Sequence, residues 1–321
     1  MSEFDFLNFK ILYGDTLLNQ SFTLFNRSDF LVQNNEKYQF QLLKNEVILV
    51  QIAFSISENT AKSPFIGPYA GFEFLTTTIN TEEFDWFIAQ IKNYLSNKGI
   101  EKINIKQQPN FFQIPNYNDL FINLHKTQVE YNQHINLTIF NEENLHQSKK
   151  RKLKKLISNH FYASKIENPT EAQLHNAYEL IAKNRHRKGF YISLDENSFG
   201  KLFQNQAVYH LFAVFTVDGK MVATSVAVLI NTEIVYHFLP ADDDEYLSES
   251  PSILLYTYIA NYFKSLGFKI FDLGISSLKE IKNEGLITFK KQLGAENIDL
   301  ITFEINLNST ITDYEINNIT T

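Results

Sequence analysis

Apolar positions along the chain fall into two similar series of predicted strands and helices. In the first half, residues 38–56 predict two apolar strands that turn at Asn45. Apolar residues at helical spacing then predict a helix that Thr81 caps, with two acidic residues in its first turn. Gly99 ends this helix, and residues 101–106 alternate between apolar and polar positions like a half-buried strand.

The second half repeats this order of elements. Residues 210–230 predict a hairpin, because the Asp-Gly dipeptide at its centre suits a turn with positive φ, and residues 233–239 predict a third strand. Ser250 and Pro251 predict the cap and first turn of an apolar helix. Gly267 ends that helix before another short apolar strand.

The two series align along their length. Gly267 follows Gly99 by 168 residues, whereas the hairpin turns at Asn45 and Gly219 lie 174 residues apart. A loop that differs by 6 residues between the copies accounts for the two spacings. A hairpin, a strand, a helix and a strand, written twice, predict two α+β domains.

Composition narrows the class of protein. The 321 residues are enough for two cores, and the 44% hydrophobic content excludes a disordered chain, so we expect domains at 1–145 and 146–321. No apolar window approaches the length of a membrane span, and the start "MSEFDFLNFK" does not have the pattern of a signal peptide. The absence of cysteine excludes disulfides and thiolate metal ligands. We therefore expect a cytoplasmic protein.

Basic residues are concentrated in two segments, although the net charge is −7. The run "KKRKLKK" at 149–155 is either the solvated face of a helix or a phosphate-binding segment, in which Lys150 and Arg151 contact a nucleotide-linked or tRNA-linked substrate. Arg185 and Arg187 form a second candidate set. Both segments predict an anionic ligand.

Four stretches resemble the GNAT acyltransferases, and together they resemble the tandem, Fem-like branch that includes aminoacyl-tRNA-dependent peptidyltransferases. They are "SPFIGPYAGFEF" at 63–74, "SKKRKLKKLISNHF" at 148–161, "NRHRKGFYIS" at 184–193 and "FDLGISSLKEIKNEGLITFKKQLGAE" at 271–296. The resemblance implies two GNAT-like (acyl-CoA N-acyltransferase) domains in tandem, each a mixed sheet flanked by helices, one of which keeps the acyl-transfer site. It also implies an acyl-CoA or aminoacyl-tRNA donor, a small-molecule or nucleotide-linked acceptor, and a role in cell-envelope biosynthesis.

The first of these stretches implies substrate contacts at Gly67, Pro68 and Tyr69. The chain departs from the resemblance at Ile66, where Fem-type peptidyltransferases often carry an arginine before the Gly-Pro pair. It also has no sustained heptad pattern of the length of the coiled-coil arm that some of them insert.

Two residues of the last stretch are candidates for catalysis. Lys290 falls inside the apolar arc of a predicted helix, so it either extends to the surface along its methylenes or meets an anionic group. That group would be a donor phosphate or the developing oxyanion. Asp272 lies near the end of a predicted strand, where it either orients or deprotonates the attacking amine or ties the turn before Gly274.

Three further positions are candidates for binding. Ser250 and Ser252 open a helix whose free N–H groups and dipole favour an anion, and in GNAT folds that helix start faces the pyrophosphate of the donor. With Gly274 they form the expected donor site. His237 is either a structural strand residue or a base facing the acyl centre. The acidic run at 242–245 does not have EF-hand spacing, so we expect no metal.

These features predict an acyltransferase that moves an acyl or aminoacyl group onto an amine. The amine would attack a bound thioester or ester directly, without a covalent enzyme intermediate. One alternative is an acetyl-CoA-dependent N-acetyltransferase of a sugar nucleotide or small amine. A second is a non-catalytic GNAT-fold protein that binds a ligand, which the acidic loop before Ser250 favours.

Overall fold

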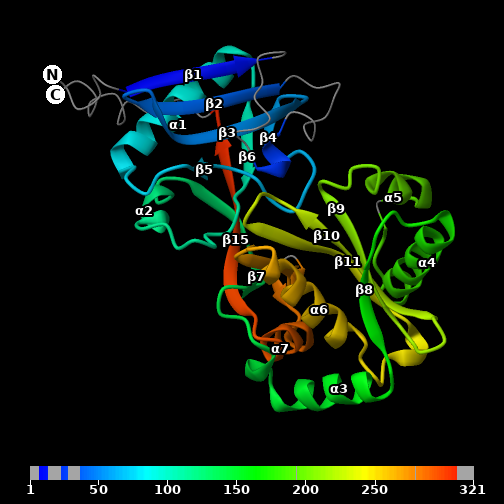
Figure 1. The fold of residues 1–321 in the computed structure, drawn as a ribbon. Helices are drawn as coiled ribbons and strands as arrows, with labels where there is room; N and C mark the ends of the chain where they lie inside the picture. Colours follow the sequence, from blue (N-terminus) through cyan, green and yellow to red (C-terminus); the bar gives the residue numbers. More distant parts are fainter. Residues whose placement is uncertain (1–6, 14–22, 28–36, 193, 279, 309–321) are drawn as a thin grey trace. The chain divides into compact units, whose positions relative to one another are not determined.

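The protein consists of two compact units, seen in Figure 1. The computed structural model describes residues 7–13, 23–27, 37–192, 194–278 and 280–308. The first unit combines Met1–Glu130 with Asp299–Thr321, and the second is Tyr131–Ile298. Each unit contains a mixed sheet and helices, so the predicted α+β class is confirmed. The division expected between residues 145 and 146 falls inside the second unit.

The sheet of the first unit has the strand order β1-β2-β3-β4-β6-β15. β4 and β6 pair in parallel, and the other neighbours are antiparallel. The elements are β1 (Leu7–Tyr13), β2 (Lys37–Lys44), β3 (Val47–Ser57), β4 (Thr60–Ser63), β5 (Glu73–Phe74), α1 (Thr81–Asn97), β6 (Lys102–Lys106), α2 (Tyr117–Leu120) and β15 (Glu296–Asn306).

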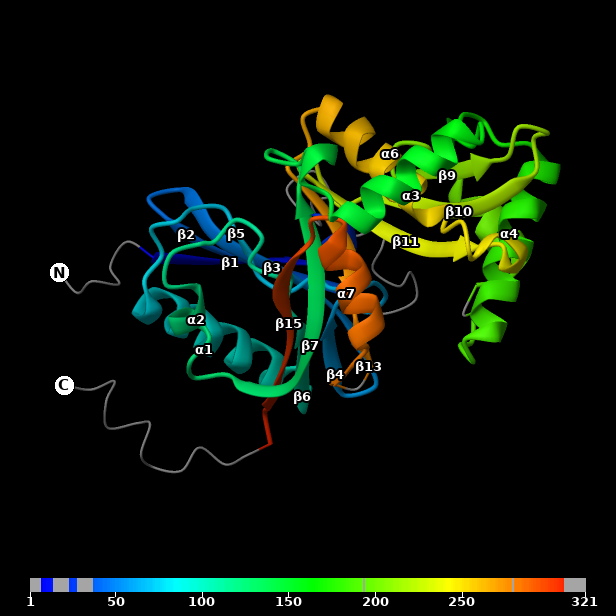
Figure 2. The same ribbon diagram turned by 90° about the horizontal axis from the view of Figure 1, so that it is seen from below.

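The sheet of the second unit has the order β7-β12-β11-β10-β9-β8, in which β11 and β12 are the parallel pair. The strands are β7 (His125–Asn136), β8 (Tyr162–Ile166), β9 (Tyr209–Phe215), β10 (Met221–Leu229), β11 (Ile234–Asp242), β12 (Ile270–Ile275), β13 (Ser277–Leu278) and β14 (Ile281–Lys282). The helices are α3 (Gln147–Ser158), α4 (Glu171–Arg187), α5 (Glu196–Leu202), α6 (Ser252–Ser265) and α7 (Glu284–Gln292). Helices α4 and α6 cover opposite faces of this sheet (Figures 1 and 2).

The predicted repeat is present in the topology. β2, β3, β4, α1 and β6 of the first unit follow the same order as β9, β10, β11, α6 and β12 of the second. The helix ends match in detail, because Gly99 and Gly267 have φ of 77° and 86°. Their N–H groups donate to the carbonyl three residues back, on Ser96 and Lys264.

The last strand of each copy is exchanged between the units. β7 follows the first copy in sequence but pairs with β12 of the second unit. β15 follows the second copy but pairs with β6 of the first unit. The second unit is therefore one continuous segment that begins within β7, whereas the first unit takes β15 from a later part of the chain. A division of the sequence into two continuous segments does not describe the first unit.

Two local predictions can be compared with the structure. The hairpin turn at Asn45 is present, and both Asn45 and Glu46 have positive φ, as a tight hairpin requires. The cap of α1 is Asn80 rather than Thr81. The Asn80 side chain accepts a hydrogen bond from the Glu83 N–H at 2.8 Å, and the Glu83 side chain accepts one from the Asn80 N–H.

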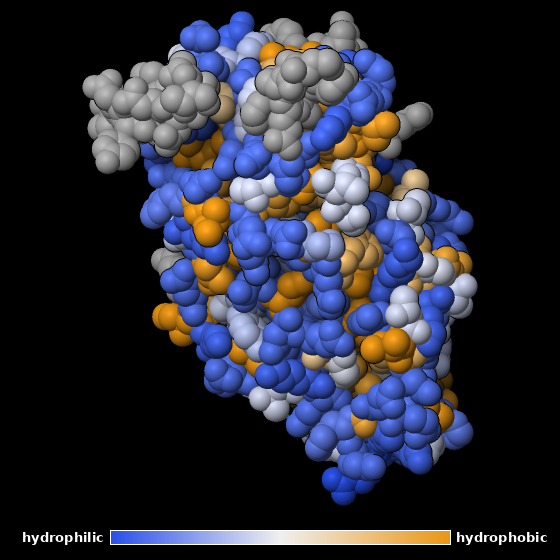
Figure 3. All heavy atoms as spheres, turned by 90° about the vertical axis from the view of Figure 1, so that its left-hand side faces the viewer, coloured by the Kyte–Doolittle hydropathy of each residue, from blue (hydrophilic) through white to orange (hydrophobic). Residues whose placement is uncertain are grey.

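Hydrophilic side chains cover most of the one face that Figure 3 shows. Figure 3 shows one face, on which apolar residues are scattered in small groups among polar and charged ones. Among the helices that the structure describes, none combines the length and the hydropathy that a membrane span requires.

Candidate functional site

The parallel strands of the second unit separate at their carboxyl ends. The register of β11 and β12 covers three residue pairs and ends at Tyr236 and Asp272. Beyond this pair β11 bulges at Leu239, a non-glycine residue with φ of 51°, and its register with β10 shifts. Pro240 follows and has no N–H for a ladder. A bulge bends its strand, so the bulge accounts for the separation of β11 from β12.

Asp272 lies at the point of separation. Its side chain is fully buried, and Oδ1 accepts hydrogen bonds from Asn132 Nδ2 at 2.8 Å and from the Gly274 N–H at 3.0 Å. The second bond ties the turn at Gly274, which is one of the two roles expected for this aspartate. Asn132 comes from β7, so the exchanged strand holds this carboxylate.

Gly274 is required where it lies. Its φ is 71°, and a Cβ built on it would be 3.3 Å from the ring and the hydroxyl of Tyr236. Burial raises the pKa of that tyrosine, the nearby Asp272 raises it further, and Arg185 opposes the rise. The Tyr236 hydroxyl is therefore protonated at neutral pH and remains a hydrogen-bond donor.

Lys290 contacts the same turn from α7. Its Nζ donates to the carbonyl oxygens of Gly274 at 2.8 Å and Ile275 at 3.2 Å, and the residue is 2% exposed. The alternative in which Lys290 extends to the surface is therefore wrong. Burial lowers its pKa to about 7, although Asp272 opposes the shift.

His237, the residue after Tyr236 on β11, points to the face of the sheet that α6 covers. Its ring lies 4.3 Å from that of Tyr256 on α6 and 5.4 Å from that of Phe271, and within the described residues neither ring nitrogen has a hydrogen-bond partner. Burial, followed by the charge of Lys290, lowers its pKa to about 3. An imidazole with that pKa is a weak base at neutral pH, which argues against His237 as the base.

In the first unit, the point after the parallel strands β4 and β6 is occupied by the loop that follows β4. The Ala70 N–H donates to the Lys106 carbonyl at 2.9 Å, and the Ala70 carbonyl accepts from the Gln108 N–H at 2.8 Å. The Gln107 side chain bonds both the N–H and the carbonyl of Phe72, at 2.7 and 2.9 Å. The loop after β4 thus continues the parallel pairing where β11 and β12 separate in the second unit.

The predicted contacts Gly67, Pro68 and Tyr69 lie in this loop of the first unit. Tyr69 is 1% exposed and packs edge-on against Phe25 and Phe111, so its ring is part of the packing. Gly67 has φ of 133°, and a Cβ on it would lie 2.6 Å from the Phe25 ring. Pro68 is half-buried.

Several basic side chains of α3 contact the acidic loop that precedes α6. Lys152 Nζ donates to Ser250 Oγ at 2.7 Å, and Lys155 pairs with Glu249 at 3.0 Å. Lys150 reaches Glu143 at 3.3 Å, across a surface where such pairs contribute little.

The remaining predicted cations differ in their surroundings. Arg151 is exposed on α3. Arg187, at the end of α4, pairs with Asp244. Arg185 lies over the Phe190 ring at 5.9 Å and is half-buried.

The start of α6 does not follow the expected cap. Pro251 is the N-cap, its own side chain makes no capping hydrogen bond, and Ser250 has φ of 59°. The Ser252 N–H donates to Asp242 Oδ1 at 3.0 Å. Both serines proposed for donor binding therefore have partners inside the protein.

Sequence reasoning missed Asn132, Tyr236 and Asp242. Asn132 begins a run of three buried polar residues on β7 that continues through Gln133 and His134. Three successive amide and imidazole side chains directly before the segment "INLTIF" could have indicated a buried polar site, because buried polar groups need hydrogen-bond partners. Among the described residues, no three His, Asp or Glu side chains gather as metal ligands would.

Comparison with known proteins identifies the fold. No family model matches the chain, and no curated protein matches it. The crystal structure of FemX is similar with a TM-score of 0.64 and 11% identity, over 84% of this chain and 88% of that chain. The chain has the tandem GNAT, Fem-like fold. The fold that the four sequence stretches predicted is thus confirmed.

Two further structures share this tandem GNAT fold. A tandem GNAT protein from the clavulanic acid biosynthesis pathway has a TM-score of 0.53 and 9% identity, over 95% of this chain and 99% of that chain. L-PGS from Bacillus licheniformis has a TM-score of 0.51 and 12% identity, over 84% of each chain. At identities this low, the structural similarity establishes the fold alone. It does not identify the acceptor or the donor.

Proposed function

We propose that the second unit transfers an acyl or aminoacyl group onto an amine at the point where β11 and β12 separate. The observation that carries the proposal is the group of buried polar residues at this point. Asp272, Gly274 and Lys290 are tied to one another by hydrogen bonds beside the last residue pair of the parallel strands. Ligands bind outside the carboxyl ends of parallel strands in open α/β sheets.

The reaction would be a direct displacement at the donor carbonyl. The amine nitrogen forms a bond to the carbonyl carbon, and the bond from that carbon to the donor oxygen or sulfur breaks. The amine loses a proton, and the leaving oxygen or sulfur gains one. Orientation of the amine and stabilisation of the oxyanion supply most of the rate.

Lys290 is the proposed oxyanion donor. A protonated lysine carries three N–H groups, and two of them bond the carbonyls of Gly274 and Ile275. In this proposal the third N–H donates to the developing negative charge. Because the pKa is about 7, ammonium and amine forms are both populated at neutral pH. Asp272 acts in this scheme as a positioning residue that holds the Gly274 turn.

The donor we favour is an aminoacyl-tRNA rather than an acyl-CoA. The Fem-like fold supports this choice, and the start of α6 bonds Asp242 instead of leaving its N–H groups for a pyrophosphate. Arg151 and Arg185 are proposed phosphate contacts. The acceptor would be a small or nucleotide-linked amine, in a cytoplasmic step of cell-envelope biosynthesis.

A non-catalytic ligand-binding protein is the second candidate. The observation that favours it is the same bond between Ser252 and Asp242, because a GNAT unit that does not bind a donor has no transfer to perform.

A transfer assay separates the two candidates. Purified full-length protein is incubated with acetyl-CoA or with a mixture of aminoacyl-tRNAs, each with a panel of amino sugars, small amines and nucleotide-linked amino acids. Mass spectrometry then detects the new amide. We expect product with aminoacyl-tRNA, and much less from the Lys290→Met variant. Ligand binding without product from either donor would support the second candidate.

A further inference from the structure

Helices α3 and α6 border an apolar groove on the surface of the second unit. Its volume is about 330 Å³, within the range of about 300–1,000 Å³ that is typical of ligand pockets. The apolar side chains that line it are Leu153 and Ile157 of α3 with Leu254, Tyr258 and Tyr262 of α6. The groove lies outside the site proposed above, and no step of the transfer uses it.

Two polar side chains of the groove are bonded to the protein itself. The Thr257 hydroxyl donates to the carbonyl four residues back at 2.8 Å, and Asn261 Nδ2 donates to Glu142 Oε1 at 2.5 Å. The rings of Tyr258 and Tyr262 are held edge-on against an aromatic side chain of β9, at centroid distances of 6.2 and 5.4 Å. A ligand in this groove would therefore be held mainly by apolar contacts.

Two lysines follow the α3 side of the groove. Residues three or four apart share one face of a helix, so Lys150 and Lys154 lie one turn before Leu153 and Ile157. Lys150 Nζ reaches Glu143 at 3.3 Å, and the residue before that glutamate lines the groove. Lys154 is exposed and belongs to none of the ion pairs found among the described residues. The apolar groove thus has two cations on its rim.

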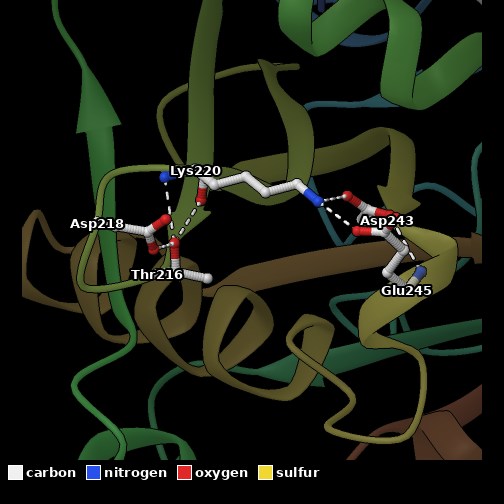
Figure 4. A network of polar contacts seen from close by, with 5 residues as sticks. All are labelled: Thr216, Asp218, Lys220, Asp243 and Glu245. Atoms are coloured by element: carbon white, nitrogen blue, oxygen red, sulfur yellow. Dashed lines mark hydrogen bonds and ion pairs between the residues drawn. The ribbon is translucent and has the colours of Figure 1, made fainter.

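The acidic loop next to α3 is compensated by other cations of the protein. Lys220, at the turn of the β9–β10 hairpin, pairs with Asp243 at 3.1 Å and with Glu245 at 2.6 Å, as Figure 4 shows. Lys155, further along α3, pairs with Glu249 at 3.0 Å. The negative charge of this loop is therefore largely balanced without Lys150 and Lys154, and α3 keeps a basic face.

The groove and the charges together favour one kind of ligand. The phosphates of a nucleic acid would meet the cations and leave the apolar groove empty. An anionic lipid uses both features, because its head group meets the cations and its chain enters the groove. Ile157 is 55% exposed and adds apolar surface at the groove. The six cations among residues 149–155 exceed what one head group needs, and such clusters are typical of helices that meet an anionic membrane surface.

We infer that α3 and α6 form a binding site for an anionic phospholipid of a membrane surface. One acyl chain lies in the groove between the two helices, and the phosphate of the head group contacts Lys150 and Lys154. The second unit would thus attach to the membrane from the outside, through α3. This site is separate from the proposed transfer and does not depend on it.

The experiment measures flotation of the full-length protein with lipid vesicles. One set consists of phosphatidylcholine alone, and the other of equal parts of phosphatidylcholine and phosphatidylglycerol. The charges are tested by the double variant Lys150→Gln/Lys154→Gln. Its control is Lys183→Gln/Lys201→Gln, which removes two exposed lysines from α4 and α5 and changes the net charge equally.

The groove is tested by Ile157→Ser. Its control is Val217→Ser, which replaces an exposed apolar residue at the turn of the β9–β10 hairpin. Surface substitutions of this kind change stability little, so each variant should remain folded, and its melting temperature verifies this.

We expect the wild type to bind the mixed vesicles at least about tenfold more tightly than phosphatidylcholine alone, and added salt to weaken this binding. Lys150→Gln/Lys154→Gln should lower the affinity by about tenfold or more, and Ile157→Ser by about threefold. Both control variants should bind like the wild type.

Three results would overturn the inference. The first is equal binding to the two kinds of vesicle, and the second is an equal loss in a variant and its control. The third is binding of total tRNA that depends on Lys150 and Lys154, without binding of the mixed vesicles. Flotation that persists in excess glycerol phosphate would support a site that holds the acyl chain as well as the head group.

Discussion

Lys290 is buried, and its ammonium group donates to two backbone carbonyls. Burial and these contacts determine its charge and the direction of its remaining N–H group. The ammonium bridges the carbonyls of Gly274 and Ile275 at the turn that Asp272 also holds. The sequence placed Lys290 in the apolar arc of its helix and left open whether the side chain extends to the surface or meets an anionic group. It did not predict the two carbonyls, since those belong to a turn whose shape depends on Tyr236 and Asn132 from other strands.

Replacing Lys290 by Met should lower turnover and preserve the fold. Methionine keeps most of the packing of the stem and deletes the donor, so kcat should fall by about 10²–10³-fold, as for other single oxyanion contacts. The control is Lys291→Met, one residue further along α7 and exposed, which should leave kcat unchanged. A Lys290→Met enzyme with wild-type turnover would end the catalytic role of Lys290.

The same variant should change how stability depends on pH. The pKa of Lys290 is lowered from 10.5 to about 7 in the folded protein, so between these values the unfolded chain binds the extra proton. Stability linked to Lys290 therefore rises with pH across this window. From pH 7 to 9 the wild type should gain about 2 kcal/mol of unfolding free energy relative to Lys290→Met. Urea titrations measure the unfolding free energy of both proteins at pH 7 and pH 9. The same difference between wild type and Lys290→Met at both pH values would contradict the lowered pKa of Lys290.

At the scale of elements, residue spacing and turn residues predicted the features that depend on neighbouring residues in the sequence. The hairpins, the helices and the glycines that end them follow from spacing and turn chemistry within a few residues. The bulge at Leu239 was not predicted, because a leucine with positive φ is imposed by its strand neighbours. The buried polar run on β7 was missed for the same reason, since its partner Asp272 lies 140 residues away.

Gly274→Ala should damage the turn at the end of β12 more than an equivalent change elsewhere. Gly267 has a similar positive φ but open space around it, whereas a Cβ at Gly274 would be 3.3 Å from the Tyr236 ring. Both variants incur the cost of a left-handed alanine, about 1 kcal/mol. Gly274→Ala should be less stable than Gly267→Ala by about a further 1 kcal/mol and should also lose transfer activity. Equal melting temperatures and equal activities would show that Tyr236 does not constrain this turn.

At the scale of the whole molecule, the sequence revealed two copies but not the exchange of their last strands. Residues 125–136 and 296–306 form the two exchanged strands, and neither was predicted from the sequence. A local pattern also does not specify which strand pairs with which, because β6 and β12 offer similar apolar faces in the two copies. Ile103 and Phe271, at equivalent positions, are both fully buried. The expected boundary after residue 145 therefore could not show that β15 completes the first unit.

Phe303→Ala should destabilise the first unit although it lies near the end of the chain. Phe303 on β15 is 1% exposed and stacks on Phe121 with ring centroids 4.9 Å apart. Loss of a buried Phe side chain costs about 3–5 kcal/mol. Trp86 on α1 is the single tryptophan, so its fluorescence reports on this unit.

The urea midpoint seen by Trp86 should fall in Phe303→Ala and change much less in Phe271→Ala, which alters the second unit. An unchanged midpoint in Phe303→Ala would show that β15 does not support the first unit.

The exchanged strands also set the order in which the protein can mature during synthesis. A ribosome releases the first copy early, but the core strand that closes it is translated among the last residues of the described chain. Until then the edge of β6 is an open template for other strands, which is a hazard for aggregation. In the second unit the order is reversed, because β7 is synthesised before its partner β12. The unit that contains the proposed site is therefore the first that can be completed, and the amino-terminal half of the polypeptide is finished last.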